Sequence, residues 1–188
     1  MTTMRSRQQG LTLVELMVTL AVAIILIAVG MPLFSGLVGS NRATTQANSL
    51  VSALKLARSE AVKRADCVIV CSNADDPDDP ADPKGCGTKD DWANGWLVHT
   101  DVNCAGSFTY PDDVLREWQL AASSSVDVTP DDAAEVRFDA AGEASSALSF
   151  ELDNSEAPGS AALRCVEVTR TGQVRSKRWD PDLAWSCR

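Results

Sequence analysis

Histidine is almost absent from this sequence, since His99 is the only one among 188 residues. A metal site built from several histidines is therefore excluded, and any Ser/His/Asp arrangement would have to use this one side chain. The sequence also lacks a glycine-rich phosphate loop after a predicted strand and a Gly-x-Ser-x-Gly nucleophile elbow. From these absences we expect neither an enzyme nor a resident metal or cofactor.

Charge is absent from Leu16 through Asn41, and the residues just before this stretch are nearly as apolar. Between Leu11 and Phe34 the side chains that are neither apolar nor glycine or proline are Thr12, Glu15 and Thr19. A helix over these 24 residues is about 36 Å long, and the hydrocarbon core of a bilayer is about 30 Å thick. The pattern predicts one membrane-spanning helix at 11–39, which leaves about 150 residues for a single soluble domain.

The residues before the apolar segment carry positive charge only. Arg5 and Arg7 are the charged residues of 1–10, and positive flanks stay on the cytoplasmic side of a membrane. The chain beyond residue 40 is then expected outside the cytoplasm. It contains all six cysteines, an even number, which is typical of a disulfide-bonded domain in an oxidising compartment.

The six cysteines allow fifteen disulfide pairings. Cys67 and Cys71 lie four residues apart in a predicted strand, about 13 Å along it, so they cannot bridge each other. The Cys-x3-Cys spacing occurs in metal sites, but no second closely spaced pair accompanies it, which favours disulfides. The pairs that we favour, the third by elimination, are Cys71 with Cys86, Cys165 with Cys187, and Cys67 with Cys104.

Acidic side chains gather in the middle of the chain. The sequence has 17 basic and 26 acidic residues, a formal net charge of −9, whereas residues 66–163 alone carry −17. The densest part, 75–83, holds five aspartates and three prolines. Prolines keep such a segment extended and like charges repel, which predicts a solvated loop. Calcium binding would need a turn that brings these carboxylates together, and the prolines oppose one.

Residues 40–65 continue the helical periodicity, but charged side chains now appear among the apolar ones. Apolar residues recur at alternating steps of four and three, with charged residues between them. The recurring residues are Ala43, Ala47, Leu50, Leu54, Ala57 and Ala61. They predict an amphipathic helix with a narrow seam of small side chains. Such a seam suits a weak coiled coil or close packing across a sheet, and we favour the sheet.

After residue 65 the apolar period changes to two, and clusters of Gly, Pro, Asp and Ser separate short segments. The predicted strands are Cys67–Cys71, Trp96–Thr100, Val114–Leu120, Val136–Phe138, Leu148–Leu152, Leu163–Thr169 and Gln173–Arg178. Short alternating segments of this kind indicate antiparallel sheet, and Arg170-Thr171-Gly172 is a plausible hairpin turn between the last two. The outer part is therefore predicted to be an α+β domain, a long helix packed on antiparallel sheets.

The segment Gln9-Gly10-Leu11-Thr12-Leu13-Val14-Glu15 at the near edge of the apolar run resembles the processing site of type IV pilins and type II secretion pseudopilins. The resemblance implies that a prepilin peptidase cuts after Gly10 and methylates Leu11, where major pilins usually carry phenylalanine. It also implies that Glu15 pairs with the N-terminal ammonium of a neighbouring subunit during assembly. Two alternatives stay open: signal-peptide cleavage beyond the apolar run, and a Glu15 that only reaches the membrane interface.

Three further segments resemble the H-type pseudopilins and related minor pilins, the GspH/FimT group. They are Ala57-Arg58-Ser59-Glu60-Ala61-Val62-Lys63-Arg64, Trp92 to Asp101, and Arg164 to Val168 with Gly172 to Arg175. The resemblance implies a pilin-like head with two packed β-sheets against the helix. It also implies an inner-membrane protein with a cytoplasmic N-terminus and a periplasmic head, later assembled with other pilin subunits.

These expectations divide the chain into four parts. Residues 1–10 are the leader, 11–39 the membrane and assembly helix, 40–65 the amphipathic helix, and 66–188 the disulfide-bonded, β-rich head. The expected function is that of a structural subunit, a minor pilin or minor pseudopilin.

A basic patch at the C-terminal end supports an alternative function. Arg175 and Lys177 are predicted to point outward from the last strand, with Arg178 and Trp179 following. Cations beside an aromatic side chain suit phosphate contact and base stacking, and related minor pilins take part in DNA uptake. The competing interpretation, which the acidity of the head favours, is a solvated strand whose charge balances acidic neighbouring subunits.

Overall fold

The computed structural model describes residues 12–74, 85–106, 113–120, 126–131, 133–154, 163–178 and 187, without the side chains of 29 and 31–37. The chain divides into two compact units, Met1–Ser35 and Gly36–Arg188, and helix α1, Leu13–Arg64, contributes to both. No helical stretch made of described residues is long and apolar enough to cross a membrane.

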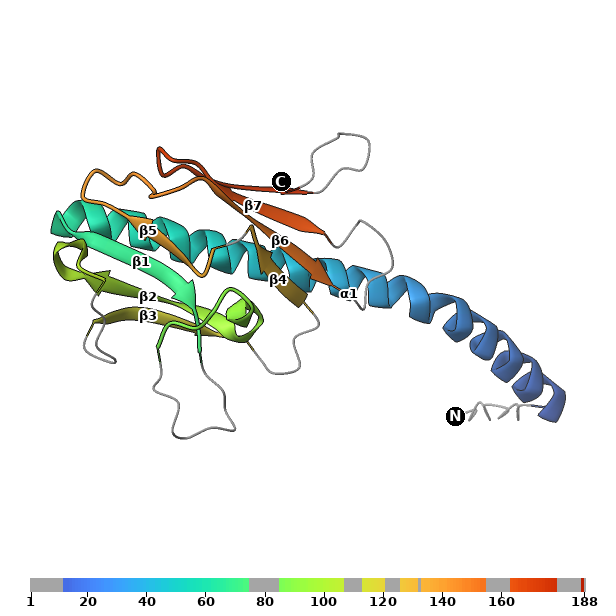
Figure 1. Ribbon diagram of the computed structural model, residues 1–188. Helices are drawn as coiled ribbons and strands as arrows, with labels where there is room; N and C mark the ends of the chain where they lie inside the picture. Colours follow the sequence, from blue (N-terminus) through green and yellow to red (C-terminus); the bar gives the residue numbers. More distant parts are fainter. Residues whose placement is uncertain are drawn as a thin grey trace, which may run out of the picture. The chain divides into compact units, whose positions relative to one another are not determined.

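The second unit has two four-stranded antiparallel sheets, with orders β3-β2-β1-β5 and β4-β6-β7-β8. The strands are β1 Cys67–Ser72, β2 Gly95–Asp101, β3 Val114–Gln119, β4 Val126–Pro130, β5 Glu135–Phe138, β6 Leu148–Asn154, β7 Arg164–Val168 and β8 Val174–Arg178, and two short 3-10 turns are η1 Asp91–Asn94 and η2 Val102–Cys104. Figure 1 shows both sheets lying along α1. The predicted α+β class, with two sheets against one helix, is confirmed.

The seam of small residues on α1 forms the centre of the core. All six predicted seam residues are at most 1% exposed, and Ala53 joins them. They pack in one cluster with side chains from both sheets and with Trp92, whose ring meets that of Phe150 edge to face at 4.8 Å. Because alanines project so little, the sheets approach the helix backbone closely, and the large aromatic rings fill the space between the layers.

Seven of the eight strands occupy the segments predicted from alternation, and β4 was not predicted. Val126 and Val128 alternate with polar residues and are buried, so the strand period is present. The segment is short, follows a serine cluster and ends on Pro130, a residue that argues against a strand interior. Its place at the edge of its sheet explains why the proline is tolerated.

Three disulfides join Cys71 to Cys86, Cys165 to Cys187 and Cys67 to Cys104. These are the pairs that the sequence favoured among fifteen. The first ties β1 to the residues after the acidic segment, the second ties residue 187 to β7, and the third joins β1 to η2. Together they close three loops within the head, which restricts its unfolded ensemble.

Candidate functional site

The start of α1 carries the residues predicted to act in assembly. Gly10 and Leu11 lie outside the described residues, whereas Glu15 is described and exposed in the first helical turn. The Thr12 hydroxyl oxygen accepts a hydrogen bond from the Glu15 backbone N–H at 3.3 Å, so Thr12 caps the helix. A carboxylate in the first turn also suits the positive end of the helix dipole.

The helix after Glu15 exposes apolar side chains all round. Ile24, Ile25, Leu26 and Ile27 are each more than half exposed. Because successive residues differ by about 100° around a helix, these four face every direction. A helix that is apolar on all sides is buried in its working state, either in lipid or among other helices. This surface and Glu15 are the features of the first unit that need a partner.

The helix end contains an arginine that fastens two turns of the head. Arg58 donates from Nε to the Gly142 carbonyl at 3.0 Å and from Nη2 to the Thr171 carbonyl at 3.1 Å. Gly172, at φ +72°, brings its turn so close that an added Cβ would collide with the Gly142 carbonyl oxygen. Arg58 and Gly172 belong to two separate segments that carry the GspH/FimT resemblance, and the structure brings them together. The sequence alone did not reveal this contact.

Strand β8 distributes the predicted basic patch over two faces. Arg175 and Lys177 are exposed on one face, and alternation puts Arg178 on the other, with Val174. Lys177 pairs with Glu167 on β7, Nζ to Oε2, at 2.8 Å. Trp179 lies outside the described residues. The described part of the patch is therefore divided, and one of its cations already has a carboxylate partner.

Arg178 lies beside a second arginine, which sequence reasoning did not single out as functional. Arg164 on β7 is 8% exposed and donates from Nε and Nη2 to the Thr44 hydroxyl of α1, at 3.1 and 2.9 Å. Burial lowers the pKa of Arg164, and repulsion from Arg178, its register partner, lowers it further. A buried arginine aimed at a helix hydroxyl fixes β7 on α1, which is a structural role.

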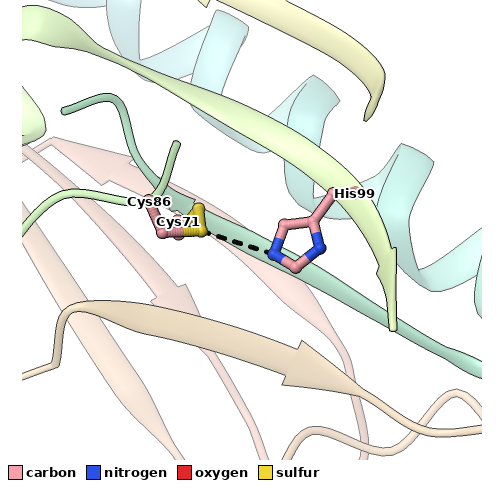
Figure 2. Close-up of side chains that lie close together, drawn as sticks. All are labelled: Cys71, Cys86 and His99. Atoms are coloured by element: carbon pink, nitrogen blue, oxygen red, sulfur yellow. Dashed lines mark hydrogen bonds between the residues drawn. A yellow bond between two sulfur atoms is a disulfide. The ribbon is translucent and has the colours of Figure 1, made fainter. Parts of the chain in front are cut away.

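His99 lies beside a disulfide in the first sheet, as Figure 2 shows. Its Nδ1 donates to the Thr100 carbonyl at 3.0 Å, and its Nε2 lies 3.4 Å from Cys86 Sγ. This ring nitrogen and the Cys71 and Cys86 sulfur atoms lie within 4.8 Å of one another, close enough to suggest a metal site. Because the two sulfur atoms are bonded to each other, they offer no thiolate ligand. His99 is a buried residue of the sheet that packs against the disulfide.

Comparisons with known proteins agree with this structure. The family described as type II transport protein GspH matches residues 46–172, and the prokaryotic N-terminal methylation motif matches residues 5–31. No curated protein matches the chain. Two crystal forms of the type IV minor pilin FimU from Pseudomonas aeruginosa share the fold at 18% sequence identity. The first has a TM-score of 0.55, and the match covers 73% of this chain and 89% of FimU. The second has a TM-score of 0.52, and the match covers 71% of this chain and 91% of FimU.

The family match covers more than half of the chain and includes most of the buried seam, strands β1 to β7 and the turn at Gly172. The methylation motif covers Gly10, Leu11 and Glu15. The chain therefore belongs to the GspH family of minor pilins and pseudopilins.

Proposed function

We propose that this protein is an assembly subunit, a minor pilin or minor pseudopilin, of a type IV pilus or a type II secretion pseudopilus. The observation that carries the proposal is the continuity between the methylation motif at 5–31 and a helix whose described residues expose apolar side chains in every direction. In a filament, such helices bury those side chains against one another. The head then presents its surface to other subunits.

Before assembly the protein is anchored in the inner membrane by the segment 11–39. Support for this comes from its uncharged sequence and from Arg5 and Arg7 on its N-terminal side. The head is then periplasmic, where its three disulfides form and persist. A prepilin peptidase cuts after Gly10 and methylates Leu11, as the methylation motif at these residues suggests.

Glu15 sets the register between neighbouring helices in this proposal. A carboxylate among apolar side chains is costly unless it is paired, and the N-terminal ammonium of an adjacent subunit supplies the opposite charge. The pair forms only between correctly staggered helices, so it selects one arrangement. Thr12 caps the first turn of the helix, in which the exposed Glu15 lies.

The experiment compares filament incorporation of the wild type, Glu15→Gln and Thr19→Val. Glu15→Gln removes the charge at nearly constant size, and we expect it to reduce the protein in sheared filaments roughly tenfold or more. Thr19→Val changes an exposed polar residue one turn further along, and this variant should assemble normally. Among the described residues, the Thr19 hydroxyl donates to the Leu16 carbonyl alone. Non-reducing electrophoresis checks that the head keeps its disulfides. Normal incorporation of Glu15→Gln would refute the proposed role.

A second candidate function, DNA binding in a competence pilus, is favoured by one observation. Arg175 and Lys177 share an exposed face of β8. Full-length protein in detergent should then shift a labelled duplex at low salt, and Arg175→Ala with Lys177→Ala should abolish the shift. The acidic head and the pairing of Lys177 with Glu167 oppose this function. Absence of any shift at low salt would eliminate it.

A further inference from the structure

A groove between the end of α1 and the β8 side of the second sheet has no role in the function proposed above. Its volume is about 680 Å³, and it lies entirely within the second unit. Lys55 and Arg58 line it from the helix, and Arg175 lines it from β8. No acidic residue is among the described residues that line it, although the protein as a whole carries a net charge of −9.

None of the three cations forms an ion pair with a carboxylate of the described residues; Glu167, the register partner of Arg175, pairs with Lys177 instead. Arg58 bonds to two backbone carbonyls, and Arg175 donates to the amide oxygen of Gln173 at 2.9 Å. Lys55 has no ion pair or hydrogen bond to the described residues. The nearby Glu60 is occupied by Lys63 and Arg64 on its own helix. The groove therefore concentrates positive charge, and the two carbonyls hold one of its guanidinium groups in place.

The residues that line the groove favour binding of a peptide over binding of a nucleic acid. Val62 and Val174 also line the groove, and they supply apolar contact for aliphatic or proline side chains of a peptide. Binding of single strands relies on aromatic side chains on which bases stack, and none is among the residues that line the groove. The strongly acidic segment 66–163 also repels a dense polyanion more than it repels a short peptide with a few carboxylates.

We propose that this groove binds an extended, aspartate- or glutamate-rich peptide segment of a neighbouring subunit. Two carboxylates of the peptide pair with Lys55 and Arg175, and its apolar or proline residues pack on Val62 and Val174. Among the described strands β8 lies at the edge of its sheet, so an extended segment lies alongside it. The source of the peptide rests on the proposed function, whereas the ligand preference of the groove is a property of this chain alone.

The experiment measures binding of a labelled peptide to the full-length protein in a non-ionic detergent. The probe is Asp-Asp-Pro-Asp-Asp-Pro-Ala-Asp-Pro, the sequence of residues 75–83, which has the required chemistry. Its control replaces every aspartate with asparagine. We expect saturable binding of the acidic probe that weakens as salt is raised, and at least tenfold weaker binding of the asparagine probe.

Variants locate the site. Lys55→Ala with Arg175→Ala should weaken binding of the acidic probe about tenfold, whereas Lys63→Ala, on the same helix but outside the groove, should leave it within about twofold. Arg58 is left intact because it also fastens the two turns. Unchanged binding in the double variant would overturn the proposal, as would equal binding of the two probes.

A third set of measurements compares peptide binding with DNA binding, and compares the role of the groove with the role of the helix in filament assembly. A labelled single-stranded DNA of about nine nucleotides should bind more weakly than the acidic probe at the same salt. Tighter binding of the DNA would assign the groove to nucleic acid and overturn the peptide proposal. Filament incorporation of the Lys55 and Arg175 double variant is measured separately from that of Glu15→Gln. Loss of peptide binding by the groove is thereby distinguished from loss of filament assembly through the helix.

Discussion

His99 is the single histidine of the chain, and it is 2% exposed in the middle of a sheet. Burial lowers the pKa of its imidazole below the ordinary 6.5, because the charged form loses its hydration. The folded head therefore holds His99 neutral, and the unfolded chain takes up the proton first as the pH falls. The stability that His99 contributes is present above pH 6.5 and is lost as the pH falls from there through the folded pKa.

Thermal unfolding of the full-length protein, followed by tryptophan fluorescence, tests this dependence. We expect the melting temperature of the wild type to decrease between about pH 7.5 and 5.5, and the decrease to be smaller in His99→Gln. The pKa of Glu60 lies below this pH range, because hydrogen bonds from Lys63 and then Arg64 lower it below the ordinary 4.5. An equal pH dependence in both proteins would contradict the account of His99.

Arg58 is the residue whose loss should most disturb the contact between α1 and the two turns. Arg58→Ala removes two charge-assisted hydrogen bonds and leaves the Gly142 and Thr171 carbonyls without that donor, at a cost of about 2 kcal/mol. Arg58→Lys should recover only part of this, because an ammonium does not reach both carbonyls as a planar fork does. Urea denaturation in detergent measures the loss.

Arg64→Ala is the matched control for Arg58→Ala. Arg64 lies on the same helix and pairs with Glu60 at an exposed i,i+4 position, an interaction worth about 0.5 kcal/mol. An equal decrease in the free energy of unfolding of both variants would show that the two carbonyl contacts of Arg58 do not stabilise the head.

At the scale of elements, alternation and helical period predicted α1 and seven strands because each pattern is local. The seam of α1 was predicted residue by residue, since burial of one helical face repeats every three to four positions. Strand β4 was missed because it is short and ends on Pro130, and its existence depends on pairing with β6. The alternation of Val126 and Val128 with polar residues is a weak signal in a segment of five residues, and pairing with β6 makes the segment a strand.

The seam makes a prediction about packing. Ala57 is fully buried where α1 meets the sheets, so Ala57→Leu inserts atoms into a closed interface and should destabilise the head by about 1 to 3 kcal/mol. Asn48→Leu adds similar bulk at an exposed position of the same helix and should change stability by less than about 0.5 kcal/mol. Urea denaturation compares the two variants. A stable Ala57→Leu protein would show that the interface is loosely packed.

The candidate site was only partly predictable at the same scale. Arg58 lies in a segment that carries the family resemblance and Thr171 lies in the predicted hairpin turn, but 84 residues separate Arg58 from Gly142, and no spacing in the sequence reveals these contacts. The basic patch was predicted as one group. Strand alternation already implied that Arg178 faces away from Arg175 and Lys177, and only the structure revealed that Glu167 neutralises Lys177.

For the whole molecule, we propose partners for two surfaces. The first unit exposes apolar helix beside Glu15, and the second presents a basic groove on an acidic head. In the proposed filament the helix packs in the interior and the head meets neighbouring heads, which gives each surface a partner. The family match covers most of the head, and the methylation motif covers the start of the helix.

Mass spectrometry of purified filaments tests the central claim most directly. The account predicts that this protein is present in the filament fraction and that its first peptide begins with N-methylated Leu11. The same helix segment that carries Glu15 would then be retained in the mature protein. Absence from the filament fraction, or a mature N-terminus beyond the apolar segment 11–39, would contradict the claim that this chain is a filament subunit.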